Sequence, residues 1–70
     1  MEIMMLKTIT ANYDSKTAVA NVVDDLVNDG IPRDEIYRDD TAMQVKVMVP
    51  ETGVAGIREL LKRHNPTNMN

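Results

Sequence analysis

The most regular segment of the chain is Met43-Gln44-Val45-Lys46-Val47-Met48-Val49-Pro50. Apolar residues occupy its odd-numbered positions, and the positions between them are polar apart from Met48. Successive side chains of a β-strand point to opposite faces, so this period of two is typical of a strand with one buried face. The segment therefore predicts a strand whose other face is mostly solvated, and Pro50 is expected to end it.

Two more strands are predicted before this segment. Residues 5–13 contain Thr and Ile but no Gly or Pro, and they alternate in the same way. A shorter strand is expected around residues 36–38, and the polar residues 39–41 are expected to connect it as a hairpin to residues 43–50. The inward side chains predicted for the first strand are Met5, Ile9, Ala11 and Tyr13.

A helix is predicted between the first two strands, because apolar residues recur there at intervals of three and four. Asp14 or Ser15 is expected to cap its first turn. At its other end, Gly30 can take the left-handed conformation that follows a helix, and Pro32 prevents continuation. Ile31 would then pack against the helix. The apolar positions are Val19, Val22, Val23, Leu26 and Val27.

A second helix is predicted after residues 43–50. Thr52 is expected to cap it. Lys62 and Arg63 lie near its carboxyl end, where cations interact favourably with the helix dipole, and Asn65-Pro66 is expected to stop it. Its apolar stripe is Val54, Ile57, Leu60, Leu61 and His64.

This order of elements predicts one α+β domain of β-α-β-β-α type at residues 1–66, followed by a disordered tail at residues 67–70. A β-α-β unit makes its strands parallel with a right-handed crossover, and a hairpin makes its strands antiparallel. Together they give a truncated ferredoxin-like sandwich, with a three-stranded sheet of order 1-3-2 and both helices on one face. Without the fourth strand of such a sheet, the first strand would be an open edge.

The composition excludes several classes of function. No cysteine and one histidine leave few ligands for a transition metal, so no metal or cofactor is expected. The net charge of -3 repels phosphate backbones, which argues against nucleic acid as a partner. No apolar run approaches the roughly 20 residues that a membrane helix needs. The apolar residues 1–6 lack a basic lead and a cleavage site, so a cytoplasmic location is expected, with translation starting at Met1, Met4 or Met5.

A homodimer is expected. A chain of 70 residues buries only about 60% of its unfolded surface, and disulfides are excluded. Pairing through the open edge or through the helix-free face of the sheet would bury more surface, with a second copy or with another protein. The expected interface residues are Leu6, Thr8, Thr10, Asn12, Gln44, Lys46 and Met48.

Several segments, taken in order, resemble a known family. They are Thr10-Ala11-Asn12-Tyr13-Asp14, Ala18-Val19, Gly30-Ile31, Asp34-Glu35-Ile36, Val45-Lys46-Val47-Met48-Val49-Pro50 and Leu60-Leu61-Lys62-Arg63-His64. Their spacing is similar to that of small ferredoxin-like domains of the bacterial general-stress-protein (heat-induced stress protein) type. The resemblance implies a bacterial, stress-related protein of that fold without established enzymatic activity.

Two groups of residues are candidate ligand sites. Thr52, Gly53 and Gly56 surround the start of the second helix, where free amide hydrogens could hold a phosphate or carboxylate. Close packing of the helix on the sheet would also explain these glycines. The carboxylates of residues 34–35 and 39–40 could bind a divalent cation, but aspartates in such connections are also common turn formers.

No enzyme is expected. His64 is the only histidine, and no nucleophile or orienting carboxylate can be assigned to it from the sequence. Its position in the last helical turn is explained by the helix dipole. The chain is therefore interpreted as a non-enzymatic interaction or regulatory module. The alternative is an ACT-like sensor of small metabolites, in which Gly30, Gly53 and Gly56 permit close approach of a ligand.

Overall fold

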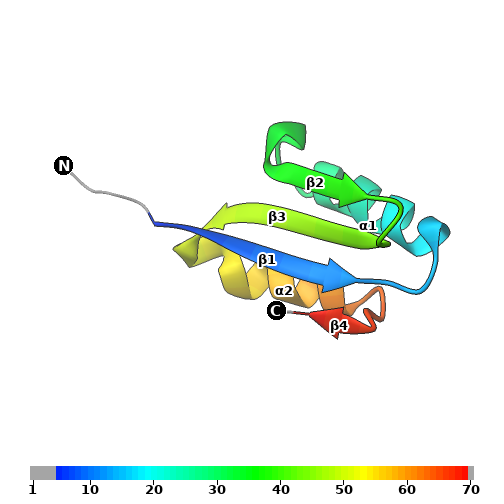
Figure 1. The fold of residues 1–70 in the computed structure, drawn as a ribbon. Helices are drawn as coiled ribbons and strands as arrows, with labels where there is room; N and C mark the ends of the chain where they lie inside the picture. The colour runs from blue at the N-terminus through cyan, green and yellow to red at the C-terminus, as the bar shows by residue number, and fades with distance from the viewer. Residues whose placement is uncertain (1–4, 70) are drawn as a thin grey trace.

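The computed structural model describes residues 5–69 and contains a sheet covered on one face by two helices (Figure 1). The strands are β1 (Leu6–Asn12), β2 (Ile36–Asp39), β3 (Gln44–Pro50) and β4 (Asn68–Met69). The helices are α1 (Lys16–Asn28) and α2 (Val54–Lys62). The 3-10 turns η1 (Arg33–Glu35) and η2 (Glu51–Gly53) precede β2 and α2. The predicted α+β class is confirmed. Met1 and Met4, two of the candidate start residues, lie outside the described residues.

The sheet has the strand order β2-β3-β1-β4, and all neighbouring strands are antiparallel. β1 and β2 both run antiparallel to β3, so they are parallel to each other, as the β-α-β crossover requires. The strands β1, β3 and β2 are neighbours in the predicted order 1-3-2. The prediction of a three-stranded sheet is wrong, because β4 adds beside β1.

β4 forms in a segment for which the sequence predicts a disordered tail. Asn65 takes a left-handed backbone conformation (φ 56°), and the Thr67 amide then donates a hydrogen bond of 2.8 Å to the Asn12 carbonyl. Two residue pairs follow, and Met69 packs against the core. Disorder is therefore wrong for residues 67–69, and residue 70 lies outside the described residues. β4 pairs with only Ala11 and Asn12 of β1.

The core lies between the sheet and the two helices. The odd-numbered residues from Ile9 to Tyr13 and from Val45 to Val49 are buried, which confirms the predicted alternation. Met5 differs from its predicted inward position, because its side chain is 57% exposed. The helices contribute the other buried side chains, which are Val19, Val22, Val23, Leu26, Ile57, Leu60 and Leu61.

The strand at β3 begins one residue later than the sequence predicts. Met43 has a positive φ of 51° and its carbonyl accepts a 2.8 Å hydrogen bond from the Tyr13 amide. The turn that closes the β2–β3 hairpin therefore extends to Met43. The side chain still packs against the core, as the period of two predicts.

Both predicted ends of α1 are confirmed. The Ser15 hydroxyl accepts a 3.1 Å hydrogen bond from the Ala18 amide, which satisfies a free donor of the first turn. Gly30 has φ 98°, and its amide bonds the Val27 carbonyl while the Ile31 amide bonds the Leu26 carbonyl. These two bonds form a Schellman motif, which requires the left-handed residue that glycine supplies most easily.

Gly30 and Gly56 allow a matched test of backbone conformation, because an added Cβ meets no atom within 4 Å at either position. We expect Gly30→Ala to lower the free energy of unfolding by about 1–2 kcal/mol, since alanine is strained at positive φ. Gly56→Ala should raise it by up to about 1 kcal/mol, since alanine favours the helix. Urea denaturation followed by circular dichroism measures both. Equal effects of the two substitutions would contradict this assignment.

The start of α2 differs from the prediction that Thr52 caps it. Thr52 lies within η2, and the N-cap residue is Gly53, which offers no side-chain hydrogen bond. The η2 turn winds directly into the helix, so the chain has no extended residue at the position where a threonine could cap.

Candidate functional site

The helix-free face of the sheet carries all seven residues predicted as an interface. The β1–β3 register pairs Thr8 with Met48, Thr10 with Lys46 and Asn12 with Gln44. Because their odd-numbered neighbours are buried under the helices, these side chains point to the opposite face. Leu6 lies on the same face at the end of β1. Their shared position follows from the register, and their role as an interface stays a prediction.

An apolar diagonal crosses this face through three strands. Leu6 and Tyr37 are 54% and 53% exposed, and Met48 is partly buried between their strands. Leu6 lies opposite Pro50 and Tyr37 opposite Lys46, so each lies diagonally from Met48, within reach of a long side chain. Tyr37 is absent from the predicted interface. Because Ile36 packs against the core, its neighbour Tyr37 must point to the helix-free face, and this alternation was the signal that could have placed Tyr37 there.

The amino-terminal half of β1 forms an uncovered edge. In the part of the chain that the structure describes, β1 has strand partners on the β4 side only at Ala11 and Asn12. Beside this edge lies a groove of about 530 Å³ between β1 and α2. Lys7 and Ile9 line one side of the groove, and Val54, Ala55 and Arg58 line the other. The prediction that the first strand is the open edge of the sheet is therefore wrong at Ala11 and Asn12, where β4 pairs with it; within residues 5–69, no strand pairs with residues 6–10 on that side.

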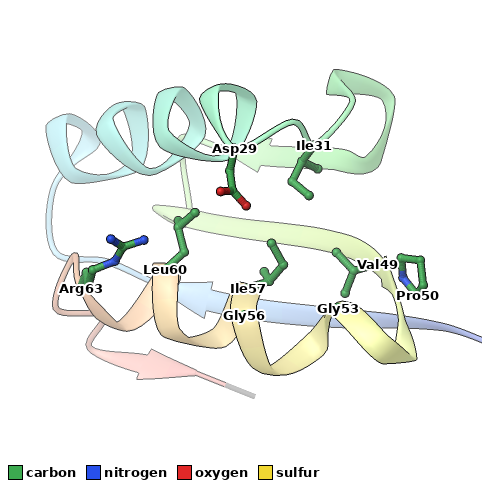
Figure 2. A pocket seen from close by; sticks show the side chains of 9 residues that line it. All are labelled: Asp29, Ile31, Val49, Pro50, Gly53, Gly56, Ile57, Leu60 and Arg63. Atoms are coloured by element: carbon green, nitrogen blue, oxygen red, sulfur yellow. The ribbon is translucent and has the colours of Figure 1, made fainter.

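A second groove, of about 390 Å³, lies between the two helices (Figure 2). Val49, Ile57 and Leu60 give it an apolar floor, and Asp29 and Arg63, which directly follow α1 and α2, point toward it (Figure 2). Gly53 and Gly56 line it on the α2 side, as the sequence led us to consider, whereas Thr52 is not among its lining residues.

Gly53, at the end of η2, and Gly56, in α2, both have room for a Cβ. A Cβ on Gly53 would lie 4.0 Å from the Val49 Cβ, and one on Gly56 would meet nothing within 4 Å. Close packing of helix on sheet, the alternative explanation for these glycines, therefore finds no support in the contacts of the described residues. No side-chain hydrogen bond caps this end of α2, but the Val54 amide already bonds the Glu51 carbonyl within η2, so this amide is not free for an anion.

His64 has a partner that sequence reasoning missed. Its Nε2 lies 3.0 Å from Oδ2 of Asp25 on α1, and both side chains are partly exposed. A histidine and a carboxylate form two members of a catalytic triad, but a nucleophile beside them is needed for that chemistry. Among the described residues, no serine, threonine or lysine is hydrogen-bonded to His64. The pair links the helices across 39 residues of sequence, which periodicity does not reveal.

Of the buried residues that the structure describes, only Tyr13 has a polar side-chain group. Its hydroxyl donates a 2.9 Å hydrogen bond to the Leu61 carbonyl and thereby joins the end of β1 to α2. Burial disfavours the charged phenolate and raises the pKa of Tyr13 to about 12. At neutral pH this group is a structural donor. A proton-transfer role would need a pKa near the working pH.

The acidic connections act as turn formers. Asp39 Oδ1 accepts a 3.0 Å hydrogen bond from the Ala42 amide, and Asp40 Oδ1 lies 2.6 Å from Arg38 Nε. Within residues 5–69, no three His, Cys, Asp or Glu side chains are grouped so that they could hold a metal ion. The same described residues include no helix long and apolar enough to cross a membrane.

No protein-family model matches the chain, and no curated protein or solved structure shows significant similarity to it. The resemblance to the general-stress-protein type therefore stays a prediction.

Proposed function

We propose that this chain is a non-enzymatic interaction or regulatory module that forms a homodimer through the helix-free face of its sheet. The observation that carries this proposal is the apolar diagonal of Leu6, Met48 and Tyr37. Exposed apolar side chains that are contiguous across three strands mark an interaction surface more reliably than scattered ones. A small domain also gains stability from burying such a face.

The charges on this face favour a second copy as the occupant. Asp39 and Lys46 both lie on it, because Asp39 pairs with Gln44 and Tyr37 pairs with Lys46. Both side chains are exposed. Two copies related by a two-fold axis could place the cation of one near the anion of the other, which is the self-complementarity that an isologous dimer needs. The remaining polar side chains would form the rim.

The dimer is tested by sedimentation equilibrium from low to high micromolar concentration. We expect the unmodified chain to dimerise and Tyr37→Lys to weaken the dimer by about tenfold or more, since it places a charge at the centre of the contact. Tyr37 lies on β2, so this variant leaves the free edge of β1 unchanged. Thr17→Lys, on an exposed position of α1, is the control. A chain that stays monomeric throughout would overturn the proposal.

The second candidate function is an ACT-like sensor of small metabolites, which the groove between α1 and α2 favours. Its apolar floor and the opposite charges of Asp29 and Arg63 match a free amino acid, which carries an ammonium, a carboxylate and an apolar side chain. A thermal-shift screen of apolar amino acids tests it. The sensor is supported if an amino acid raises the melting temperature of the unmodified chain and of Arg33→Gln, but not that of Arg63→Gln. Arg33 is not among the lining residues of this groove. No stabilisation by any amino acid would contradict it.

The proposed module would act in the bacterial cytoplasm, in a stress-related role, as its resemblance to the general-stress-protein type led us to expect. A fluorescent fusion followed in bacteria before and after heat stress tests the location and the response. Unchanged abundance under stress would remove the stress-related part and leave the proposed dimer in place.

A further inference from the structure

We propose that the free half of β1 is a docking site for an extended acidic segment of another protein, which adds to the sheet as a strand. This surface is separate from the helix-free face, so the inference does not depend on the proposed dimer. It rests on three features of the edge: a main chain without a strand partner among residues 5–69, the groove beside it and the charges in that groove.

The main chain of β1 presents hydrogen-bonding groups at this edge. At the two ends of the β1–β3 ladder, the Tyr13 amide bonds the Met43 carbonyl and the Glu51 amide bonds the Met5 carbonyl. The amide and carbonyl groups of odd-numbered β1 residues therefore point to β3, and those of even-numbered residues point to the opposite edge of β1. The Asn12 carbonyl fits this rule, because it accepts the Thr67 amide. Leu6 and Thr8 consequently direct their amide and carbonyl groups to the uncovered edge.

The groove would receive side chains of an added strand. Figure 1 shows β4 beside the far end of β1 only, so a new strand would occupy the path that a longer β4 would take. Its residues would alternate between the helix-free face and the groove of about 530 Å³. Val54 and Ala55 give that groove apolar surface for every second side chain.

The charges of the groove select the partner. Lys7 and Arg58 line it together with one acid, Glu51, so it is locally positive in a chain whose net charge is -3. A strand with acidic and apolar residues on its inward side would complement both charge and surface. A second copy of β1 fits less well, because it would bring another Lys7 to a groove that already holds two cations.

The binding test uses a fluorescein-labelled octapeptide in which threonine alternates with glutamate and valine, and a second peptide with lysine in place of glutamate. Fluorescence anisotropy should show that the acidic peptide binds about tenfold or more tightly than the basic one. Lys7→Glu combined with Arg58→Glu should reverse that preference. Lys46→Glu makes the same change of charge on the helix-free face and should leave the preference intact.

The strand-addition geometry is tested at Thr8. Thr8→Pro removes the amide that the partner strand needs, while the β1–β3 ladder does not use that amide. We expect loss of acidic-peptide binding in Thr8→Pro and normal binding in Thr8→Val, with circular dichroism confirming folding. Should Thr8→Pro fail to fold, amide hydrogen exchange of the unmodified chain replaces it. The Thr8 amide should then become protected when the acidic peptide is added.

Three outcomes would overturn the inference. The first is equal binding of the acidic and basic peptides, or no binding of either. The second is a Thr8 amide that stays unprotected at saturating peptide. The third is protection of the Thr8 amide in the absence of peptide, if this protection increases with protein concentration. That result would show that a second copy of the chain occupies the edge. None of these outcomes changes what Tyr37→Lys measures, so the dimer and the docking site succeed or fail separately.

Discussion

Leu26→Ala is expected to lower the free energy of unfolding by about 2–5 kcal/mol, because it removes a side chain at the centre of the core. Leu26 is fully buried on the inner face of α1, where it is among the largest fully buried side chains. A folded chain of this length is stable by roughly 4–10 kcal/mol in total. The substitution therefore removes about half of the stability, and the urea midpoint is expected to fall by a similar fraction.

Leu6→Ala is the matched control for that prediction. The same atoms are removed from a side chain that is 54% exposed, so a change within about 0.5 kcal/mol is expected. Urea denaturation followed by circular dichroism measures both variants at one low protein concentration, so that any dimer contributes equally little. Similar losses in the two variants would contradict the assignment of Leu26 to the core and of Leu6 to the surface.

The second large effect is a loss of stability in alkali that depends on Tyr13. Its pKa is raised from 10.0 to about 12 in the folded protein, because burial disfavours the phenolate. Above pH 10 the unfolded chain releases this proton while the folded chain retains it, so the unfolded state binds fewer protons. The free energy of unfolding then falls with pH, by about 1.4 kcal/mol per unit at most, until pH approaches the folded pKa. The stabilisation is fully present below pH 10.

Comparison of Tyr13→Phe with Tyr37→Phe shows whether the Tyr13 hydroxyl, and not another titrating group, causes the loss of stability in alkali. Tyr13→Phe removes the hydrogen bond to the Leu61 carbonyl and should cost about 1–3 kcal/mol at neutral pH. It should also remove most of the loss above pH 10. Tyr37→Phe changes an exposed side chain and should leave both the neutral stability and the alkaline loss nearly as they are. An equally steep alkaline loss in Tyr13→Phe would show that another group causes it.

Local sequence patterns predicted most of the fold correctly. The alternation around Val45 and Val47 placed β3, and its face, because a half-buried strand repeats every two residues. Ser15 and Gly30 placed the two ends of α1, because free amides and carbonyls at helix ends need specific partners. The same alternation brought the seven predicted interface residues to one face. These features depend on interactions between residues that are near neighbours in the chain.

Most of the features that the sequence did not predict depend on contacts between distant segments. β4 is two residues long, which is too short for a periodic pattern, and it forms because Asn65 and Thr67 return the chain to Asn12. The partners of His64 and of the Tyr13 hydroxyl come from helices or helix ends 39 and 48 residues away. Thr52 failed as a cap because the η2 turn leads directly into α2.

The sequence by itself determined the two helices, the three longer strands, both ends of α1 and the buried side of each of these elements, because these depend on periodicity and on capping chemistry within a few residues. Only the tertiary structure decided what lies side by side across elements. Lys7 and Arg58 share a groove because β1 and α2 pack together, and within residues 5–69 the first half of β1 has no partner on this side because β4 pairs with Ala11 and Asn12 alone. Such neighbours are set by the register and packing of distant segments, which no local pattern contains.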